Sequence, residues 1–315
     1  MTDVTPGDEH FWPTLTREPD GRVTLVANKE TPSLLSLSGF ETAARIPSRE
    51  FEITAADLVR AAATRERIEA ERREIEGTGR LALRLGEAPQ VDGDLADWND
   101  ADFVTIESRG ASASFNSNSK PYMIRGAVRA SGETLYVAWS TEGAGLLADN
   151  SGEEPVLQFK TGGGLDLMLG TDPAAPASRT EPAAGDVRLL VSTVKGVPRA
   201  MLYEAVDPGA SPDEAVPFTS PTGTVVFDRV RDVTGEIAFA SGRTADYELA
   251  VPFSVLGLPP LSAGMELKGD VGVLRGTGGT TVARTYWSNK ATAIVSDVPS
   301  EAELKPANWG VFDIE

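Results

Sequence analysis

The sequence contains no cysteine and a single histidine, His10, among its 315 residues. The lack of cysteine excludes disulfide bonds, thiolate metal sites and a cysteine nucleophile. Because His10 lies in a polar N-terminal stretch, the sequence also argues against a Ser-His-Asp triad and against zinc sites built from histidines. The chain is therefore predicted not to be an enzyme of these classes.

Long apolar runs and positive charge are also scarce. No stretch approaches the roughly 20 apolar residues of a membrane-spanning helix. The formal net charge of −18 disfavours nucleic acid or an anionic membrane as a partner, since both bind basic surfaces. The N-terminus lacks the basic and apolar segments of a signal peptide, so for an exported protein we expect the signal on a longer parent chain. Hydrophobic residues make up 41% of the sequence, which is enough for a sizeable core.

The sequence pattern divides the chain into three parts. Residues 1–53 are polar and carry two short strand patterns, at 22–27 and 34–37, which predict a tail and the strand remnant of a preceding domain. Residues 54–79 predict a linker helix, because this stretch is rich in Ala, Glu and Arg and has no proline. Residues 80–315 show no second helical pattern and are predicted to form one β domain.

Short apolar or alternating runs follow one another from residue 80 onward, separated by Gly, Pro, Asn and Asp. This spacing is typical of an antiparallel β-sandwich of the jelly-roll or immunoglobulin-like kind, whereas a doubly wound fold would need crossover helices. We therefore predict a mainly β fold, preceded by a short strand pair and one α-helix. Strands are predicted at 81–85, 103–107, 122–130, 134–140, 156–160, 165–170, 187–194, 198–206, 223–230, 236–240, 246–253, 270–276 and 281–288, with surface loops at 171–186 and 202–221.

The stretch VDGDLADW, residues 91–98, is an acidic turn followed by a tryptophan. Asp92, Asp94 and Asp97 alternate in a way that can supply oxygen ligands to calcium. The alternative interpretation is an Asx-type turn that only reverses the chain. Trp98, which follows at once, is predicted to belong to the core, because burying a tryptophan removes a large apolar area from water.

The motifs VDGDLADWNDA, TLYVAWS, LDLMLGTD, YELAVPFSVLGL, GDVGVLRG, RTYWSNK and a terminal WGVF follow one another in this order. The ordered set resembles the family 9 carbohydrate-binding modules and their DOMON-like relatives, over roughly residues 83–315. Two stretches, QFKTGGGLDLML and RTYWSNKATAIVSDVPSEAELKPANWG, are also similar to the C-terminal β-module of large secreted bacterial proteins. The resemblance implies a non-catalytic β-sandwich that works outside the cell or at its surface.

The resemblance also implies a sugar site in which two tryptophan rings clamp a terminal sugar, with structural calcium nearby. Trp287 matches the aromatic residue that lies late in the chain of such modules. The other aromatic is expected in the stretch EEPVLQFKTGGG, which contains Phe159. Hydrogen-bonding residues surround Trp287, as pyranose recognition requires, because sugar CH groups stack on the ring while hydroxyls need donors and acceptors. The candidate ligand-binding residues are Trp287, Asn289, Tyr286, Phe159 and Lys290.

A second class of function stays open, that of a structural or interdomain scaffold on a cell-surface protein without a small ligand. In that case Trp287 would serve packing alone. Trp139 and Trp309 are predicted to pack in any case, the first because it alternates with apolar residues on one strand face and the second because it precedes the last strand. An exposed aromatic surface at Trp287 would separate a sugar-binding module from a scaffold.

Two further classes of function, a glycosidase and a haem-binding protein, each require particular residue types. A glycosidase would need two carboxylates roughly 5–10 Å apart across a cleft, and four aspartates are predicted at strand edges. Haem binding, as in other DOMON relatives, would need axial histidine or methionine ligands, and three methionines fall in strand patterns that suit core packing instead. These residues are Asp166, Asp186, Asp246 and Asp270, and Met123, Met168 and Met201.

The sequence thus predicts a non-catalytic, extracellular carbohydrate-binding module of a longer protein. Its expected partners are a poly- or oligosaccharide and the other domains of the parent chain, with neither nucleic acid nor membrane insertion. No cofactor is expected apart from structural calcium, for which Asp92, Asp94 and Asp97 are the candidate ligands.

Overall fold

A computed structural model describes ten stretches of the chain: residues 14–17, 23–26, 59–60, 62–64, 79–107, 113–114, 123–141, 149–242, 246–289 and 297–315. The chain divides into two compact units, residues 1–71 and residues 72–315. No helix within the described stretches is long and apolar enough to cross a membrane.

The first unit contains a short antiparallel pair of strands, β1 (Thr14–Arg17) and β2 (Val23–Val26). β2 confirms the strand predicted at 22–27, whereas β1 falls partly in a stretch predicted to be irregular. Residues 59–60 and 62–64 are helical, in agreement with the predicted linker helix. The rest of that helix and the strand predicted at 34–37 lie outside the described residues.

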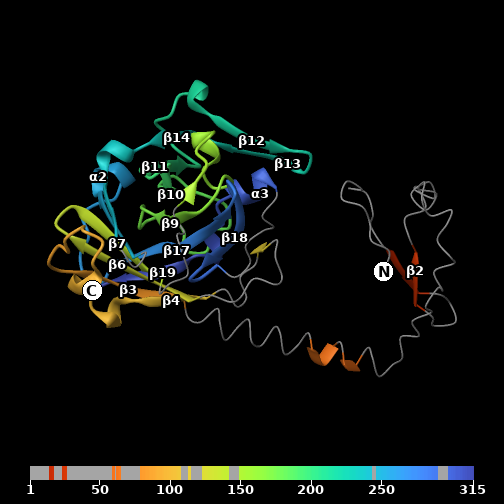
Figure 1. Ribbon diagram of the computed structural model, residues 1–315, viewed down its shortest axis with the longest axis horizontal. Helices are drawn as coiled ribbons and strands as arrows, with labels where there is room; N and C mark the ends of the chain where they lie inside the picture. The colour runs from red at the N-terminus through yellow and green to blue at the C-terminus, as the bar shows by residue number, and fades with distance from the viewer. Residues whose placement is uncertain are drawn as a thin grey trace. The chain divides into compact units, whose positions relative to one another are not determined.

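The second unit is a β-sandwich whose two layers are joined by β3 (Figure 1). β3 pairs in parallel with β19 of one layer and with β6 of the other, so the hydrogen-bonded ladder continues around this corner. The mainly β sandwich predicted from the sequence is confirmed. The first layer contains β3 (Arg80–Leu85), β4 (Val104–Glu107), β6 (Met123–Ser131), β7 (Thr134–Ser140), β15 (Ala238–Ser241) and β16 (Tyr247–Pro252).

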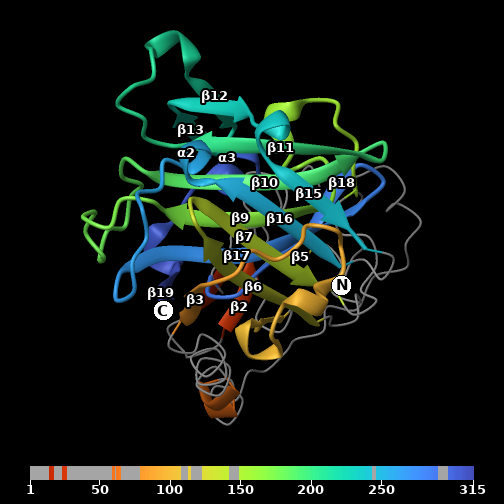
Figure 2. The same cartoon turned by 90° about the vertical axis from the view of Figure 1, so that its left-hand side faces the viewer.

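The second layer places β11, β10, β9 and β17 side by side (Figure 2). The long strand β17 pairs along one edge with β9 and along the other first with β19 and then with β18. This layer contains β5 (Ala113–Ser114), β8 (Asp149–Asn150), β9 (Gly164–Gly170), β10 (Asp186–Val194), β11 (Val197–Glu204), β14 (Arg229–Asp232), β17 (Glu266–Thr277), β18 (Thr280–Tyr286) and β19 (Gly310–Ile314).

The core between the layers follows from strand alternation. Leu165, Leu167 and Leu169 of β9 point into it, as do Val187, Leu189 and Val191 of β10, because residues two apart share one face of a strand. Trp139 of β7 is fully buried there, as predicted, and its indole Nε1 donates to the carbonyl of Gly272 at 3.2 Å. One end is closed by α2 (Phe253–Leu256), which carries three apolar residues into the core: Phe253, Val255 and Leu256.

The outer face of β9 and β10 is buried as well, because further elements cover it. The antiparallel hairpin β12 (Val216–Ser220) and β13 (Gly223–Phe227) and the short helix α3 (Val298–Ala302) lie over this face (Figure 1). Together with η5 (Pro155–Leu157) they enclose a second apolar cluster that includes six aromatic rings. All seven residues of β9 are buried for this reason. Four of the six rings pack edge-to-face, those of Phe159, Tyr203, Phe218 and Phe227, and the other two belong to Tyr286 and Trp309.

Three local predictions are wrong. Residues 156–160 form the 3-10 turn η5 and the turn after it rather than a strand, because Pro155 opens a helical turn and Gln158 hydrogen bonds through its side chain to two carbonyls. The segment 202–221, predicted to be a loop, contains the end of β11 and all of β12. Met123 opens β6 at the edge of the layer and is 51% exposed, whereas Met168 and Met201 are buried as predicted.

The remaining short elements are 3-10 turns that connect strands. They are η3 (Leu95–Asp97), η4 (Asp100–Asp102), η6 (Pro212–Glu214), η7 (Thr234–Glu236) and η8 (Pro306–Asn308). The loop predicted at 171–186 is irregular up to β10.

Candidate functional site

Trp287 lies directly after the end of β18, where the strand turns into a loop. Its backbone N–H donates to the carbonyl of Val271 at 2.9 Å. Its indole packs beside the ring of Phe312, with centroids 6.0 Å apart and planes tilted by 31°. The ring also covers Gly310, where an added Cβ would overlap the indole, so glycine is required at that position. Trp287 is therefore held on one side by the sandwich.

Trp287 differs in exposure from the other tryptophans in the described part of the chain. Trp98, Trp139 and Trp309 are 7%, 0% and 3% exposed, whereas Trp287 is half-buried. The predictions that Trp98 and Trp309 pack in the interior are confirmed. A half-buried indole has a part that is accessible to a ligand, which the buried three lack.

The loop after Trp287 is fixed by one carboxylate. Asp270 on β17 accepts hydrogen bonds from the backbone N–H of Ser288 at 2.9 Å and from that of Asn289 at 2.7 Å. The hydroxyl of Ser288 donates to the carbonyl of Asn308 at 3.1 Å. Asn289 is buried, and Lys290 lies outside the described residues. Asp270 thus presets the backbone beside the indole.

Phe159 and Tyr286, the other aromatic candidates, do not join Trp287. Tyr286 and Trp287 are consecutive at the end of a strand and belong to different apolar clusters, Tyr286 to the outer one and Trp287 to the margin of the inter-layer core. Phe159 lies in the outer cluster, 0% exposed, with its ring edge-on to Tyr203 at 5.9 Å and to Phe218 at 5.3 Å. The structure therefore brings Trp287 together with Asn289 but not with Phe159.

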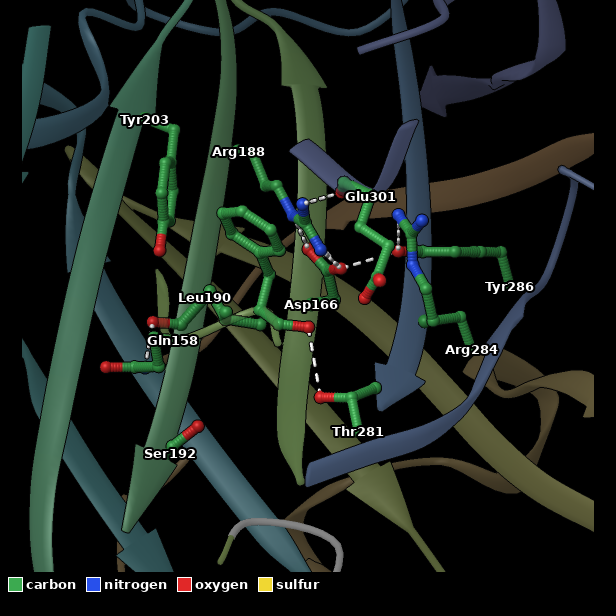
Figure 3. Close-up of polar contacts among 12 residues, drawn as sticks. Gln158, Asp166, Arg188, Leu190, Ser192, Tyr203, Thr281, Arg284, Tyr286 and Glu301 are labelled. Carbon is green, nitrogen blue, oxygen red and sulfur yellow. Dashed lines mark hydrogen bonds and ion pairs between the residues drawn. The ribbon is translucent and has the colours of Figure 1, made fainter. Parts of the chain in front are cut away.

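A group of charged side chains is buried on the outer face of β9, β10 and β18 (Figure 3). We call Asp166, Arg188, Arg284, Tyr286 and Glu301 the buried charge cluster. Arg188 donates to Asp166 through Nε at 3.0 Å and Nη2 at 2.7 Å, and its Nη1 donates to the carbonyl of Glu301 at 2.8 Å. Tyr286 Oη donates to Asp166 Oδ2 at 2.7 Å and accepts from Arg284 Nη2 at 3.1 Å.

A glycine makes this cluster geometrically feasible. Gly272 on β17 lies between Asp166 of β9 and Tyr286 of β18 in the strand register. A Cβ at Gly272 would overlap the Tyr286 ring, so the ring can cross the sheet toward Asp166 only because no side chain stands there. The sequence alone marks only Asp166 and Tyr286 of this cluster, because its members are spread over 136 positions, from 166 to 301.

Burial sets the electrostatics of the cluster. Removal from water raises the pKa of Glu301, and this effect exceeds the opposing attraction of Lys160, whose Nζ lies 3.1 Å from Glu301 Oε1. Burial also raises the pKa of Tyr203 and Tyr286 well above the ordinary value, so both phenols are neutral near neutral pH. Neither phenol is therefore a proton donor poised near neutral pH, and Glu301 is the member of the cluster whose pKa burial raises.

The acidic turn at residues 91–98 closes on a buried carboxylate of β16. Glu248, 1% exposed, accepts hydrogen bonds from the backbone N–H of Asp92 at 3.0 Å, from that of Gly93 at 2.7 Å and from Trp98 Nε1 at 2.8 Å. Gly93 has φ of 87° and its backbone lies directly against Gly242, so this position requires glycine. The segment is a turn anchored by its tryptophan.

The three aspartates of this turn each accept a backbone hydrogen bond. Asp92 Oδ1 accepts from the N–H of Asp94 at 2.8 Å, Asp94 Oδ1 accepts from that of Ala96 at 3.1 Å, and Asp97 Oδ2 accepts from that of Gln90 at 2.9 Å. The first two bonds, each from the N–H two positions further along the chain, have the geometry of an Asx turn. Among the described residues, which include all three, no group of three or more His, Cys, Asp or Glu side chains could hold a metal ion.

The remaining aspartates that the sequence marked are also engaged by hydrogen bonds. Asp186 forms an ion pair with Arg179 inside the loop before β10. Asp246 accepts from the backbone N–H of Thr141 at 3.3 Å, and Asp166 and Asp270 hold the partners given above. Each of these four carboxylates thus has a local structural role.

Comparisons with known proteins find similar chains among solved structures. No protein-family model matches the sequence, and no curated protein matches it. Among solved structures the chain is similar to a family 9 carbohydrate-binding module from Caldicellulosiruptor kristjanssonii in complex with glucose, with 11% identity, a TM-score of 0.43, and coverage of 75% of this chain and 95% of that one. The same module in complex with cellotriose gives 10% identity, a TM-score of 0.44 and coverages of 75% and 93%.

A third similar structure is that of a candidate carbohydrate-binding protein from Bacteroides uniformis. It shares 10% identity with this chain at a TM-score of 0.42, and the match covers 75% of this chain and 99% of that one.

Proposed function

We propose that the chain is a non-catalytic carbohydrate-binding module that works outside the cell as part of a longer protein. The observation that carries the proposal is the half-buried indole of Trp287, packed on one side against Phe312 and Gly310. An aromatic ring fixed on one side by the protein offers its accessible part to the CH groups of a pyranose.

The polar surroundings of the ring support the same proposal. Sugar hydroxyls need donors and acceptors whose positions are preset, because ordering them on binding would cost free energy. Asp270 fixes the backbone of Ser288 and Asn289, so the loop next to the indole is already ordered. With a single aromatic surface, we expect weak binding to one sugar residue at a chain end or on a polymer surface.

The test is a fluorescence titration with glucose, cellobiose and cellotriose, the first and last being the sugars in the two similar structures. The titration uses a Trp12→Phe background, which removes the fluorescence of a tryptophan that lies outside the described residues. We expect saturable quenching or a blue shift that Trp287→Ala abolishes. Calorimetry with the same sugars measures the affinity independently.

The matched control is Phe239→Ala, which removes another half-buried aromatic ring, stacked on Tyr247 at the opposite layer. This variant should bind sugar as the parent does. Binding that survives Trp287→Ala would place the sugar elsewhere. A folded parent that responds to none of the sugars would overturn the proposal and favour the scaffold function, in which Trp287 serves only to cover Gly310 and Phe312.

A further inference from the structure

Arg284 is buried with most of its hydrogen-bonding capacity unused. It is 2% exposed, and within the described residues only its Nη2 has a hydrogen-bond partner, the phenol of Tyr286. Its Nε and Nη1 are buried without one. Of the five N–H donors of a guanidinium, Nε carries one and Nη1 carries two, so three donors on these two atoms are unmet in a place that bulk water does not reach. Such a group costs several kcal/mol unless something pairs with it.

The carboxylates near Arg284 are committed to other cations. Asp166 is held by two nitrogens of Arg188 and by the Tyr286 hydroxyl. Glu301 pairs with Lys160 through Oε1. Three cations, at Lys160, Arg188 and Arg284, thus face two carboxylates, at Asp166 and Glu301, which leaves one positive charge in excess.

The sequence around Arg284 supplies no further carboxylate. In the strand register Arg284 lies opposite Ala113 of β5, and residues 108–122, which include β5, contain neither Asp nor Glu. Residues 290–296, which come shortly after β18, also contain no Asp or Glu. The excess charge is therefore not balanced by the chain segments that adjoin Arg284 in sequence or in register.

We propose that Arg284 binds one small monovalent anion, of halide or simple carboxylate chemistry, at its free Nε and Nη1. An anion accepts the unmet hydrogen bonds and also cancels the excess charge, whereas a water molecule does only the first. Charge-assisted hydrogen bonds of this kind are about twice as strong as neutral ones. The site is separate from the proposed sugar surface, since Arg284 lies with the outer face of the sheet and Trp287 with the inter-layer core.

Glu301 gives the site a second contact. Its Oε2 is buried without a partner, and Figure 3 shows its carboxyl group between the Asp166–Arg188 pair and Arg284. Burial raises the pKa of Glu301, although Lys160, Arg284 and Arg188 oppose this. When Glu301 is protonated, Oε2–H donates a hydrogen bond and removes one negative charge beside the site. The anion should therefore bind more tightly as the pH falls.

The test measures bromide binding in solution and in crystals. Unfolding temperature is recorded while bromide replaces a bulky sulfonate at constant ionic strength and at two pH values. We expect a saturable rise that is larger at the lower pH, because a ligand of the native state alone stabilises it by mass action. In crystals grown with bromide, an anomalous peak should lie within hydrogen-bonding distance of Arg284 Nε and Nη1.

Arg284→Met removes the donors and keeps much of the bulk, so it should abolish the bromide-dependent rise and unfold at a higher temperature than the parent without bromide. Arg231→Met is the matched control, since Arg231 pairs with Glu204 at the surface and that variant should keep the rise. An unchanged rise in Arg284→Met would overturn the proposal. So would a wild-type crystal with bromide that shows only water, or no peak, beside Arg284, and this result does not depend on any variant folding.

Discussion

Two buried carboxylates, Glu248 and Asp166, lie on the outer faces of the two layers and differ in the kind of groups that hydrogen bond to them. Glu248 accepts hydrogen bonds from two backbone N–H groups and one indole, all neutral and all from residues 92–98. Asp166 accepts from Arg188 and from Tyr286, which come from two other strands. The first site closes a local turn, whereas the second ties together β9, β10 and β18.

The difference shows how a buried charge shapes its surroundings. A carboxylate satisfied by neutral donors leaves no counter-charge to place, so the turn at residues 91–98 is complete in itself. A carboxylate that pairs with an arginine requires a second, positive charge to be buried with it. The charged groups around that pair must then be balanced as well. The excess cation at Arg284 is a consequence of the second arrangement.

The largest effect is expected from breaking the ion pair of the buried charge cluster. Asp166→Ala leaves Arg188 with an unpaired charge at 0% exposure, and we expect a loss of about 3–5 kcal/mol in the free energy of unfolding. Urea denaturation followed by circular dichroism measures it. The double variant Asp166→Leu with Arg188→Met removes both charges and should recover much of this loss. If the double variant is as unstable as the single one, the cost comes from lost packing and not from the unpaired charge.

Glu248→Leu tests the neutral counterpart. It leaves the backbone N–H groups of Asp92 and Gly93 and the indole N–H of Trp98 without an acceptor. We expect a loss of about 3 kcal/mol in the free energy of unfolding. Here the double-variant strategy should fail, because backbone donors cannot be removed by substitution. Denaturation gives the size, and a red shift of Trp98 emission reports the opened turn. A loss under about 1 kcal/mol would mean that water replaces the carboxylate.

A smaller effect is expected from filling the gap beneath Tyr286. Gly272→Ala places a Cβ into the tyrosine ring, and overpacking of this kind costs about 1–3 kcal/mol. Gly132→Ala is a control of a different kind, since its Cβ would meet no atom and only the backbone strain of φ 56° would be felt. Equal losses in the two variants would show that the ring moves aside freely.

The smallest effect is a pH dependence of stability that arises where α3 meets the hairpin of β12 and β13. Hydrogen bonds from Ser220 and Ser300 lower the pKa of Asp297 to about 2, and this residue joins α3 to the turn between β12 and β13. A folded-state pKa below the unfolded value near 4 means that its stabilisation is complete above about pH 4 and is lost as the pH falls toward 2.

Asp297→Asn does not titrate, so the stability difference between the parent and this variant should shrink over that range. The measurement is urea denaturation of both proteins at several pH values from 6 to 2. A difference independent of pH would contradict the assigned role of Asp297.

Much of the fold could be predicted from local patterns. The alternation of Leu165, Leu167 and Leu169 marks a strand of the core, and the turn at residues 91–98 could be interpreted from its aspartates and Trp98. The failures have a common cause. Phe159 belongs to a turn that a distant hairpin covers, and Met123 opens a strand at the edge of its layer, so for both residues the environment depends on non-local contacts.

The sequence by itself determined the mainly β class, the order of most strands and the acidic turn, because each depends on residues a few positions apart. The absence of cysteine also excludes disulfide bonds and a cysteine nucleophile. Only the tertiary structure decided that Phe159 and Trp287 lie in different apolar clusters, and that Asp166, Arg188, Arg284, Tyr286 and Glu301 meet under α3. Strand pairing and the covering hairpin set these contacts, and neither leaves a local trace in the sequence.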